Sequence, residues 1–217
     1  MARLETLTMT IDDAGGPHRA LREDEMDIDP LVELRLWIDQ ALAAGIAEPT
    51  AAALATATRD GCPSVRIVLA RPVEDEITFY THYESRKARE LDENPRAALA
   101  YHWPLLGRQV RLEGSVERAT AAASDAYFDA RPVPSRLSAW ASPQSHAIPD
   151  RAFLERRVRE LASRYRHARI PRPTFWGGYR LRPHVVEFWQ SGPHRLHDRL
   201  RYAAATNGGW RIERLAP

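Results

Sequence analysis

The sequence predicts an α+β fold that is mainly β, an antiparallel barrel with helices packed outside it. Short apolar segments with strand character follow one another along the chain and are separated by turn residues, which is typical of a β meander. About nine such segments stand against four helical ones, and they do not alternate with helices as in a parallel α/β sheet. The 217 residues are enough to bury a substantial core. We expect a single domain over residues 29–217, preceded by a flexible arm over residues 1–28.

The first half of the chain predicts one helix and a run of three strands. Residues 1–28 are polar, rich in Asp and without periodicity, which is typical of a flexible arm. From Pro30 onward apolar side chains recur at helical spacing, with Asp29 as the N-cap and Gly45 as the terminator. The three strands are expected at residues 51–58, 64–71 and 76–82.

The second half of the chain mixes short helices and strands. The expected helices are residues 85–94, 120–130 and 152–167, and the expected strands are residues 96–102, 109–117, 177–181, 185–190, 200–204 and 210–214. Pro95 ends the first of these helices, and Pro132 and Pro134 stop the second.

Charge and composition exclude several classes of protein. The formal net charge is only +2, so we expect no nucleic-acid partner. No apolar run approaches the roughly 20 residues that cross a bilayer, and the N-terminus lacks the apolar segment of a secretory signal. We therefore expect no membrane partner and a cytoplasmic location. The single cysteine, Cys62, excludes an internal disulfide bond and a thiol-rich metal site.

The segment from Val185 to Pro217 gathers aromatic, histidine and arginine side chains beside one short strand. Arg195, His197 and Arg199 alternate, so an extended backbone would direct all three toward one side. Two guanidinium groups and an imidazole could then face a phosphate or an electron-rich ring. From the residues alone, the pattern fits a solvated strand face as well as a site for an anionic, aromatic ligand.

A second candidate site lies at Ser85–Lys87, where a predicted strand ends and a helix begins. The first turn of a helix leaves backbone N–H groups unpaired and carries a positive dipole end, so it favours a phosphate. Arg86 and Lys87 would strengthen such a site. Lys87 is also the only lysine among 31 basic residues, the others being arginine. The alternative is an N-cap serine followed by solvated charges.

Longer motifs run through the chain from Asp29 to Pro217. They read FYT, SRKARE, NPRAAL, GRQVRLEG, WASPQS, FWGGYR, EFWQ and RLHDR, before a chain end in RLAP. In this order, almost without gaps, they resemble the pyridoxine/pyridoxamine 5'-phosphate oxidase family. The resemblance implies an antiparallel split β-barrel of the FMN-binding oxidase type. It also implies FMN as the cofactor, no metal, and a homodimer that binds FMN at the subunit interface.

The resemblance further implies roles for individual residues, carried over by position. FMN would be bound by Arg66, Ile67, Val68, Leu69, Tyr80, Thr81, Arg86, Lys87, Gln109, Gln144, Ser145, Trp189 and Arg199. The substrate phosphate would be bound by Arg71, Tyr127, Arg131 and Ser135. Tyr127 and Arg131 are four residues apart, so they would share a helix face. Arg195 and His197 would lie over the substrate ring as the catalytic residues.

The activity that this resemblance implies is oxidation of pyridoxine or pyridoxamine 5'-phosphate to pyridoxal 5'-phosphate. A hydride would pass from C4' of the phosphorylated pyridine to N5 of FMN, and O2 would be reduced to hydrogen peroxide. An amine substrate would form an imine that water hydrolyses. The protein would chiefly place the two rings and anchor the phosphate away from the reacting carbon. Arg195 and His197 would orient the ring substituents or assist proton transfer.

Two departures from the family pattern concern the substrate side of the site. Arg71 stands where the family commonly has lysine; arginine keeps the charge but has a different geometry. Residues 1–36 lack the R-x-x-Y motif that often helps to close the family's site, which leaves Arg19 and Arg22 as the nearby basic residues.

Two alternatives therefore remain open. The first is an FMN oxidase of secondary metabolism, of the phenazine-biosynthesis type, although such an enzyme would have no reason to keep Tyr127, Arg131 and Ser135. The second, from a different class, is a flavin or pyridoxal phosphate carrier without turnover. Arg195 and His197 argue against the carrier, and stoichiometric peroxide release would exclude it.

Overall fold

The computed structural model describes residues 20–206 and 208–217, which form eight strands, five α-helices and three short 3-10 helices. The strands are β1 (Ala51–Ala57), β2 (Pro63–Val73), β3 (Glu76–His82), β4 (Arg96–Trp103), β5 (Arg108–Arg118), β6 (Trp176–Gln190), β7 (Asp198–Ala204) and β8 (Trp210–Arg214). The α-helices are α1 (Pro30–Ala43), α2 (Arg86–Glu93), α3 (Ala121–Ala130), α4 (Val133–Ala141) and α5 (Arg151–Arg164). The 3-10 helices are η1 (Glu23–Glu25), η2 (Pro104–Leu106) and η3 (Pro193–Arg195).

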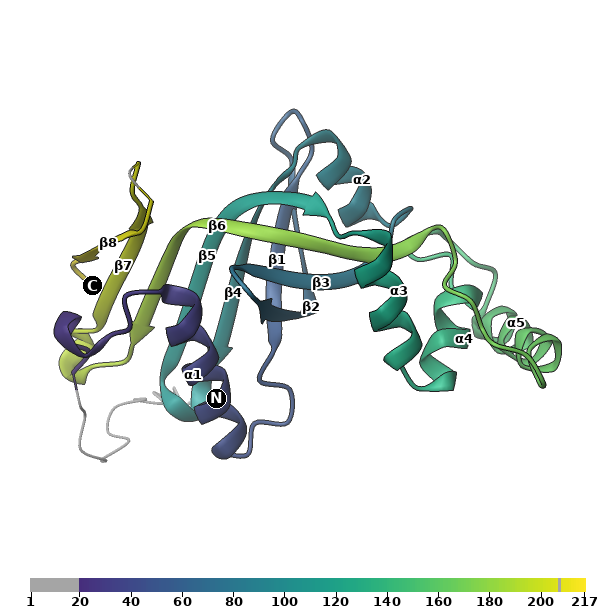
Figure 1. The fold of residues 1–217 in the computed structure, drawn as a ribbon, viewed down its shortest axis with the longest axis horizontal. Helices are drawn as coiled ribbons and strands as arrows, with labels where there is room; N and C mark the ends of the chain where they lie inside the picture. Colours follow the sequence, from purple (N-terminus) through teal and green to yellow (C-terminus); the bar gives the residue numbers. More distant parts are fainter. Residues whose placement is uncertain (1–19, 207) are drawn as a thin grey trace, which may run out of the picture.

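The strands of the described chain form one antiparallel sheet in the order β3-β2-β1-β4-β5-β6-β7-β8. An additional pairing between β3 and β6 closes the part of the sheet from β3 to β6 into a barrel. Strands β7 and β8 continue the sheet beyond the barrel, and α3, α4 and α5 gather at the opposite end of the molecule (Figure 1). The predicted antiparallel barrel with outer helices is confirmed.

Strand β6 runs along most of the long axis of the molecule (Figure 1). It is continuous over 15 residues, whereas the sequence predicted two strands, at 177–181 and 185–190. That prediction is wrong because a β-bulge, where Gly114 of β5 faces Pro183, lets the strand continue past the proline. Glycine is required at this point, since a Cβ on Gly114 would lie 2.2 Å from the carbonyl oxygen of Arg182.

Helix α4 was not expected from the sequence, which predicted Pro132 and Pro134 only as a stop for α3. Helix α3 does end at Ala130, but the same prolines begin a new helix. Pro132 is the N-cap of α4 and Pro134 lies in its first turn, where a missing N–H costs no helical hydrogen bond. Helix α4 therefore adds an unpredicted wall beside the barrel.

Helices α1 and α2 pack near opposite ends of strand β1 (Figure 1). Helix α1 begins as predicted, with the Asp29 side chain accepting the N–H of Leu31 at 2.8 Å. Its Trp37 packs edge-on against Trp103 and Phe188, with ring centroids 6.4 Å and 4.9 Å away. No helix among the described residues is both long enough and apolar enough to span a membrane.

Residues 20–28, the described part of the predicted arm, contact the C-terminal strands. Arg214 of β8 pairs with Glu23 at 2.9 Å and donates to the backbone carbonyl of Leu21 at 2.6 Å. Leu21 is itself buried. Residues 1–19, which include Arg19, lie outside the described residues, and the flexible arm stays a prediction there.

Candidate active site

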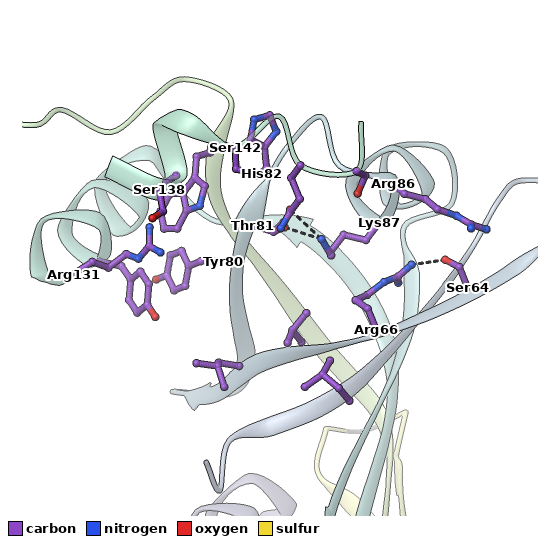
Figure 2. A pocket seen from close by; sticks show the side chains of 18 of the residues that line it. Ser64, Arg66, Tyr80, Thr81, His82, Arg86, Lys87, Arg131, Ser138 and Ser142 are labelled. Carbon is purple, nitrogen blue, oxygen red and sulfur yellow. Dashed lines mark hydrogen bonds between the residues drawn. The ribbon is translucent and has the colours of Figure 1, made fainter. Parts of the chain in front are cut away.

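A cavity of about 700 Å³ opens between β2, β3, α2 and the helices α3 and α4 (Figure 2). This volume is in the range of sites for small molecules. Most of the predicted cofactor residues line it, together with two predicted substrate residues. These lining residues are Arg66, Ile67, Val68, Leu69, Tyr80, Thr81, Arg86, Lys87, Gln144, Ser145, Tyr127 and Arg131.

One side of the cavity is cationic. Arg66 of β2 and Arg86 and Lys87 of the first turn of α2 form a group that we call the cationic cup (Figure 2). Lys87 is only 7% exposed, and its Nζ donates to Thr81 Oγ1 at 3.0 Å and to Gln144 Oε1 at 3.2 Å. Burial, with the nearby charge of Arg66, lowers the pKa of Lys87 to about 8. Cations at the N-terminal end of a helix suit a phosphate.

The other side of the cavity is aromatic (Figure 2). Tyr80 and Tyr127 stack with ring centroids 3.6 Å apart, and Trp176 stacks on Tyr80 at 5.6 Å. Gly178 faces Tyr80 across β3 and β6, and a Cβ there would lie 2.9 Å from the tyrosine ring, so glycine leaves room for the stack. Arg131 lies 4.8 Å from the Trp176 ring, and its Nη1 is buried without a hydrogen-bond partner among the described residues. This unpaired N–H group is a second donor for an anion.

Tyr127 and Arg131 reach the cavity in a different way from the prediction. They were expected to share a helix face, but α3 ends at Ala130 and Arg131 is its C-cap, with an extended backbone. Tyr127 therefore projects from the helix, whereas Arg131 projects from the turn that follows it.

Several lining residues were not predicted. Ser138 and Ser142 come from the C-terminal half of α4 and its end, and His82 and Trp176 come from β3 and β6. Burial lowers the pKa of His82, whose Nδ1 accepts the backbone N–H of Glu84. The spacing of the two serines would have placed them on one helix face if α4 had been recognised. Trp176 lies inside the FWGGYR motif, but the resemblance to the family gave this tryptophan no role.

Two of the four residues predicted to bind the substrate phosphate do not line the cavity. Ser135 lies in the first turn of α4, one turn before Ser138. Arg71 lies on β2, near enough to Tyr80 for its charge to oppose the rise in pKa that burial gives the tyrosine. Arg71 is therefore near the aromatic side of the cavity, and the phosphate contacts of both residues stay a prediction.

The remaining predicted residues form a second group where β5, β6 and β7 meet. Gln109, Trp189 and Arg199 lie directly opposite one another on these three strands, so they share one face of the sheet. His197 packs on Trp189, with ring centroids 4.7 Å apart. Together with Arg195, we call these residues the C-terminal cluster.

Neighbouring groups hold two side chains of the C-terminal cluster. The Arg199 guanidinium makes a bidentate ion pair with Glu187, at 2.9 Å and 3.1 Å. His197 Nδ1 accepts the backbone N–H of Gly192 at 3.2 Å. A neutral His197 therefore carries its proton on Nε2, which leaves a donor for another group.

The expectation that Arg195, His197 and Arg199 alternate along one extended strand is wrong. Arg195 ends η3 with φ 62° and follows His194 at φ 54°, while β7 begins only at Asp198. Residues other than glycine are uncommon in this left-handed region, which costs conformational energy. Two such residues in succession turn the chain between β6 and β7 and place Arg195 in a loop.

The cationic cup and the C-terminal cluster lie near opposite ends of β6, because Lys87 of the cup donates to Thr81, which pairs with Gly177 at the start of the strand. Trp176 at the start of β6 lines the cavity, whereas Trp189 near its end belongs to the C-terminal cluster. The strand has 15 residues and, at ~3.3 Å per residue, is roughly 45 Å long. One chain therefore does not bring both groups to the same small ligand.

Two family models match the chain. Residues 38–165 match the model described as "Pyridoxamine 5'-phosphate oxidase". The chain belongs to the pyridoxamine 5'-phosphate oxidase family. Residues 176–217 match a second model, "Pyridoxine 5'-phosphate oxidase C-terminal dimerisation region". This second match contains β6, β7 and β8 and most of the C-terminal cluster.

Curated relatives and solved structures agree with the family. Proteins named "Pyridoxine/pyridoxamine 5'-phosphate oxidase" from Cyanothece sp. (strain PCC 7425) and Ralstonia pickettii (strain 12J) are 50% and 52% identical to this chain. The matches cover 97% and 89% of this chain, and 100% and 91% of the relatives. The resemblance predicted from the motifs, to a family of oxidoreductases, is confirmed.

Two solved structures share the fold. PhzG from Burkholderia lata 383, in complex with tetrahydrophenazine-1-carboxylic acid, has a TM-score of 0.86 at 35% identity, over 93% of this chain and 100% of that one. A pyridoxamine 5'-phosphate oxidase-related, FMN binding protein from Nostoc punctiforme has a TM-score of 0.69 at 20% identity, over 84% and 97%. The predicted split barrel is therefore confirmed.

Proposed function

We propose that this family member is an FMN-dependent oxidase that converts pyridoxine 5'-phosphate or pyridoxamine 5'-phosphate into pyridoxal 5'-phosphate, with O2 as the final electron acceptor. The observation that carries the proposal is that one cavity has two separate cationic positions. The cationic cup lies on one side, and Arg131 lies beside the aromatic side. Two phosphates, one on the cofactor and one on the substrate, need two such positions with room for their rings between them. The names of the relatives that are 50% and 52% identical support the same activity.

The cavity residues fit FMN. Three cations beside one buried carboxylate, that of Glu90, leave a net positive charge for a phosphate dianion. Val65 and Ile67 of β2 are 68% and 67% exposed and line the same cavity, so they offer an apolar surface to a flat ring. When bound, FMN would supply the group that accepts a hydride from C4' of the substrate and passes the electrons to O2.

The substrate would be placed by residues at both of its ends. Tyr127 and Arg131 would hold the phosphate, and the unpaired Nη1 of Arg131 supports this role. A phosphate anchored away from the reacting carbon lets binding energy fix the position of the ring. His197 would hydrogen-bond the substituent at C4' and fix its orientation, Arg195 would orient the ring, and the proton that the substituent loses would pass to solvent.

The C-terminal cluster would reach the cavity from a second subunit. The length of β6 supports this arrangement, because it separates the two groups within one chain. The match of residues 176–217 to a dimerisation region supports a homodimer. We therefore propose that FMN lies at the subunit interface, where Gln109, Trp189 and Arg199 of one subunit complete the cavity of the other.

Anaerobic mixing of the FMN-loaded protein with pyridoxamine or pyridoxine 5'-phosphate tests the proposed function. We expect the flavin absorbance to bleach in a single turnover, and to recover with stoichiometric hydrogen peroxide when air is admitted. Pyridoxamine without the phosphate is the matched control substrate, and it should react at least about 100-fold more slowly, because the phosphate contacts are charge-assisted. Tight binding of the phosphorylated substrate with no bleaching would contradict the proposal and favour a carrier.

A second candidate function is oxidation of a tricyclic acid. The likeness to PhzG, at 35% identity and a TM-score of 0.86, favours it. The pair of Tyr127 and Arg131 supports the phosphorylated substrate instead, because it places a cation where a phosphate anchor is needed. Bleaching by a reduced phenazine carboxylic acid, but not by the phosphorylated pyridines, would reverse this preference.

The affinity for FMN is expected to fall as the pH rises above about 8. Lys87 has a pKa of about 8 in the cationic cup, and a bound phosphate would raise it, so binding at higher pH requires uptake of a proton. Below pH 8 the lysine is already charged and adds no pH dependence. Above it, Kd should rise by up to about tenfold per pH unit until the pKa of the bound state is reached.

Fluorescence titration of the apo-protein with FMN at several pH values measures this change. Riboflavin, which has the same ring without the phosphate, is the control ligand. Parallel changes in the affinities for FMN and riboflavin would contradict the assignment of Lys87 to the phosphate.

A further inference from the structure

We propose that Glu90 is a positioning residue for the cofactor phosphate: its carboxylate holds Arg66 and Arg86 in the positions from which both line the cavity. This inference rests on the proposed function, because it takes the cationic cup as the site of the FMN phosphate. Glu90 is not among the residues that line the cavity. It would therefore act through the two arginines and not on the ligand itself.

The Glu90 carboxylate joins α2 to strands β1 and β2. Its Oε1 accepts Nε of Arg86 at 2.8 Å, and its Oε2 accepts Nη2 of Arg66 at 3.3 Å. The same Oε2 accepts the hydroxyl groups of Thr56 and Ser64. Glu90 is only 4% exposed, so these protein donors, in place of water, satisfy the carboxylate.

The two hydroxyl groups connect Glu90 to Arg66 a second time. Nη1 of Arg66 donates to the hydroxyl oxygen of Thr56. Its Nη2 donates to the hydroxyl oxygen of Ser64, as Figure 2 shows. Each hydroxyl thus accepts from the guanidinium and donates to the carboxylate. The carboxylate oxygen takes both hydroxyl protons, which leaves the hydroxyl oxygens free to accept from Arg66.

Arg86 depends on Glu90 more directly. Its side chain is 56% exposed, compared with 20% for Arg66, and the ion pair with Glu90 is the contact that ties its guanidinium to the protein in the described structure. Without this contact the long side chain would populate several rotamers in solvent. Ordering it again on binding would cost affinity for the phosphate.

The charge of Glu90 makes the proposal testable, because it acts against the ligand. Burial alone would raise the pKa of Glu90, but hydrogen bonds from Ser64, Thr56 and Arg86 and the charge of Arg66 lower it to about 2. The group is therefore an anion next to a site for anions. If charge alone decided affinity, neutralising Glu90 would tighten the binding of FMN. If positioning decides, the same change weakens it.

The experiment compares apo-proteins of the wild type, Glu90→Gln, Glu90→Asp and Glu93→Gln. Glu93 is an exposed glutamate of the same helix, so Glu93→Gln matches the chemical change away from the cup. Fluorescence titrations measure Kd for FMN and for riboflavin, and thermal unfolding without ligand reports on the fold. Riboflavin isolates the effect on the phosphate from any effect on the ring.

We expect Glu90→Gln to weaken the binding of FMN about tenfold or more, and that of riboflavin much less, because the hydrogen bonds lost are charge-assisted and hold only the phosphate-binding arginines. Glu90→Asp keeps the charge but shortens the side chain, so its Kd for FMN should lie between those of the wild type and Glu90→Gln. If Glu90→Gln does not fold, Glu90→Asp provides the comparison with the wild type. Glu93→Gln should have the same Kd values for FMN and riboflavin as the wild type.

Two outcomes would overturn the role of Glu90 alone. One is an FMN affinity in the Glu90 variants equal to or tighter than that of the wild type. The other is an equal loss of FMN and riboflavin binding. A wild type that binds riboflavin as tightly as FMN would instead overturn the proposed phosphate site, and the role of Glu90 with it.

Discussion

Replacing Lys87 with methionine is expected to lower the affinity for FMN on the order of 100-fold. A hydrogen bond between an ammonium group and a phosphate contributes about 2–3 kcal/mol, which is close to two orders of magnitude in Kd. The Nζ of Lys87 is fixed at the cavity wall by Thr81 and Gln144 (Figure 2), so little side-chain entropy is lost on binding. The flavin content of the purified protein and an FMN titration of the apo-protein measure the effect.

The same substitution should leave the apo-protein about as stable as the wild type. Folding lowers the pKa of Lys87 from 10.5 to about 8, so the folded state disfavours its charged form. This destabilisation is roughly 3 kcal/mol at pH 7; it is fully present below pH 8 and disappears as the pH rises toward 10.5. Methionine removes it, but also removes hydrogen bonds to Thr81, Ser85 and Gln144 worth about 1 kcal/mol each. The two effects nearly cancel, and urea unfolding without ligand measures the balance.

Arg89→Met is the matched control for Lys87→Met. Arg89 is an exposed cation of the same helix that donates to the backbone carbonyl of Glu84 and does not line the cavity. The Arg89→Met protein should bind FMN as tightly as the wild type and have the same free energy of unfolding. A Lys87→Met protein that purifies with a full complement of flavin would contradict the phosphate assignment, and so would an equal loss of flavin in both variants.

The elements with a clear local signal were predictable from the sequence, and those that depend on distant residues were not. The N-cap Asp29 and the apolar spacing after it were sufficient to place α1. The continuity of β6 was missed because the bulge that accommodates Pro183 depends on Gly114 of another strand. The closing pair of β3 and β6 likewise joins segments far apart in the chain, and no local pattern contains it.

The predicted site residues divide in the same way. Motif residues such as Arg66 and Lys87 were predictable, because each lies in a short motif and both line the cavity. Glu90 was missed because its sequence context is that of an exposed helix residue four positions after Arg86, and its burial depends on hydroxyl groups from β1 and β2. The resemblance implied that the cup and the C-terminal cluster bind one FMN at a subunit interface, but no sequence pattern indicated that a single chain holds the two groups near opposite ends of β6.

A hybrid dimer of two inactive variants is expected to recover about half of the wild-type activity. One subunit would carry Lys87→Met in the cationic cup, and the other would carry Arg195→Ala with His197→Ala in the C-terminal cluster. If each site combines the cup of one subunit with the cluster of the other, the hybrid has one site with both changes and one site with neither. The unchanged site should turn over at the wild-type rate.

Co-expression with two different affinity tags and purification on both would isolate the hybrid. Each homodimer should be nearly inactive, and a doubly tagged wild-type dimer is the control for the effect of the tags. The measurement is peroxide release per dimer, together with the flavin content. The hybrid should bind about one flavin per dimer, because one of its two cups lacks the lysine.

The activity of the hybrid distinguishes the two possible arrangements of the site, because they predict opposite results from the same protein. If the cup and the cluster of a single chain served one flavin, every site in the hybrid would carry one damaging change, and no activity would return. That outcome would require β6 to bend far enough to bring Trp176 and Trp189 to one ligand, against its length of roughly 45 Å. Half activity would instead assign each flavin to two subunits, and it would explain why the dimerisation region carries residues of the active site.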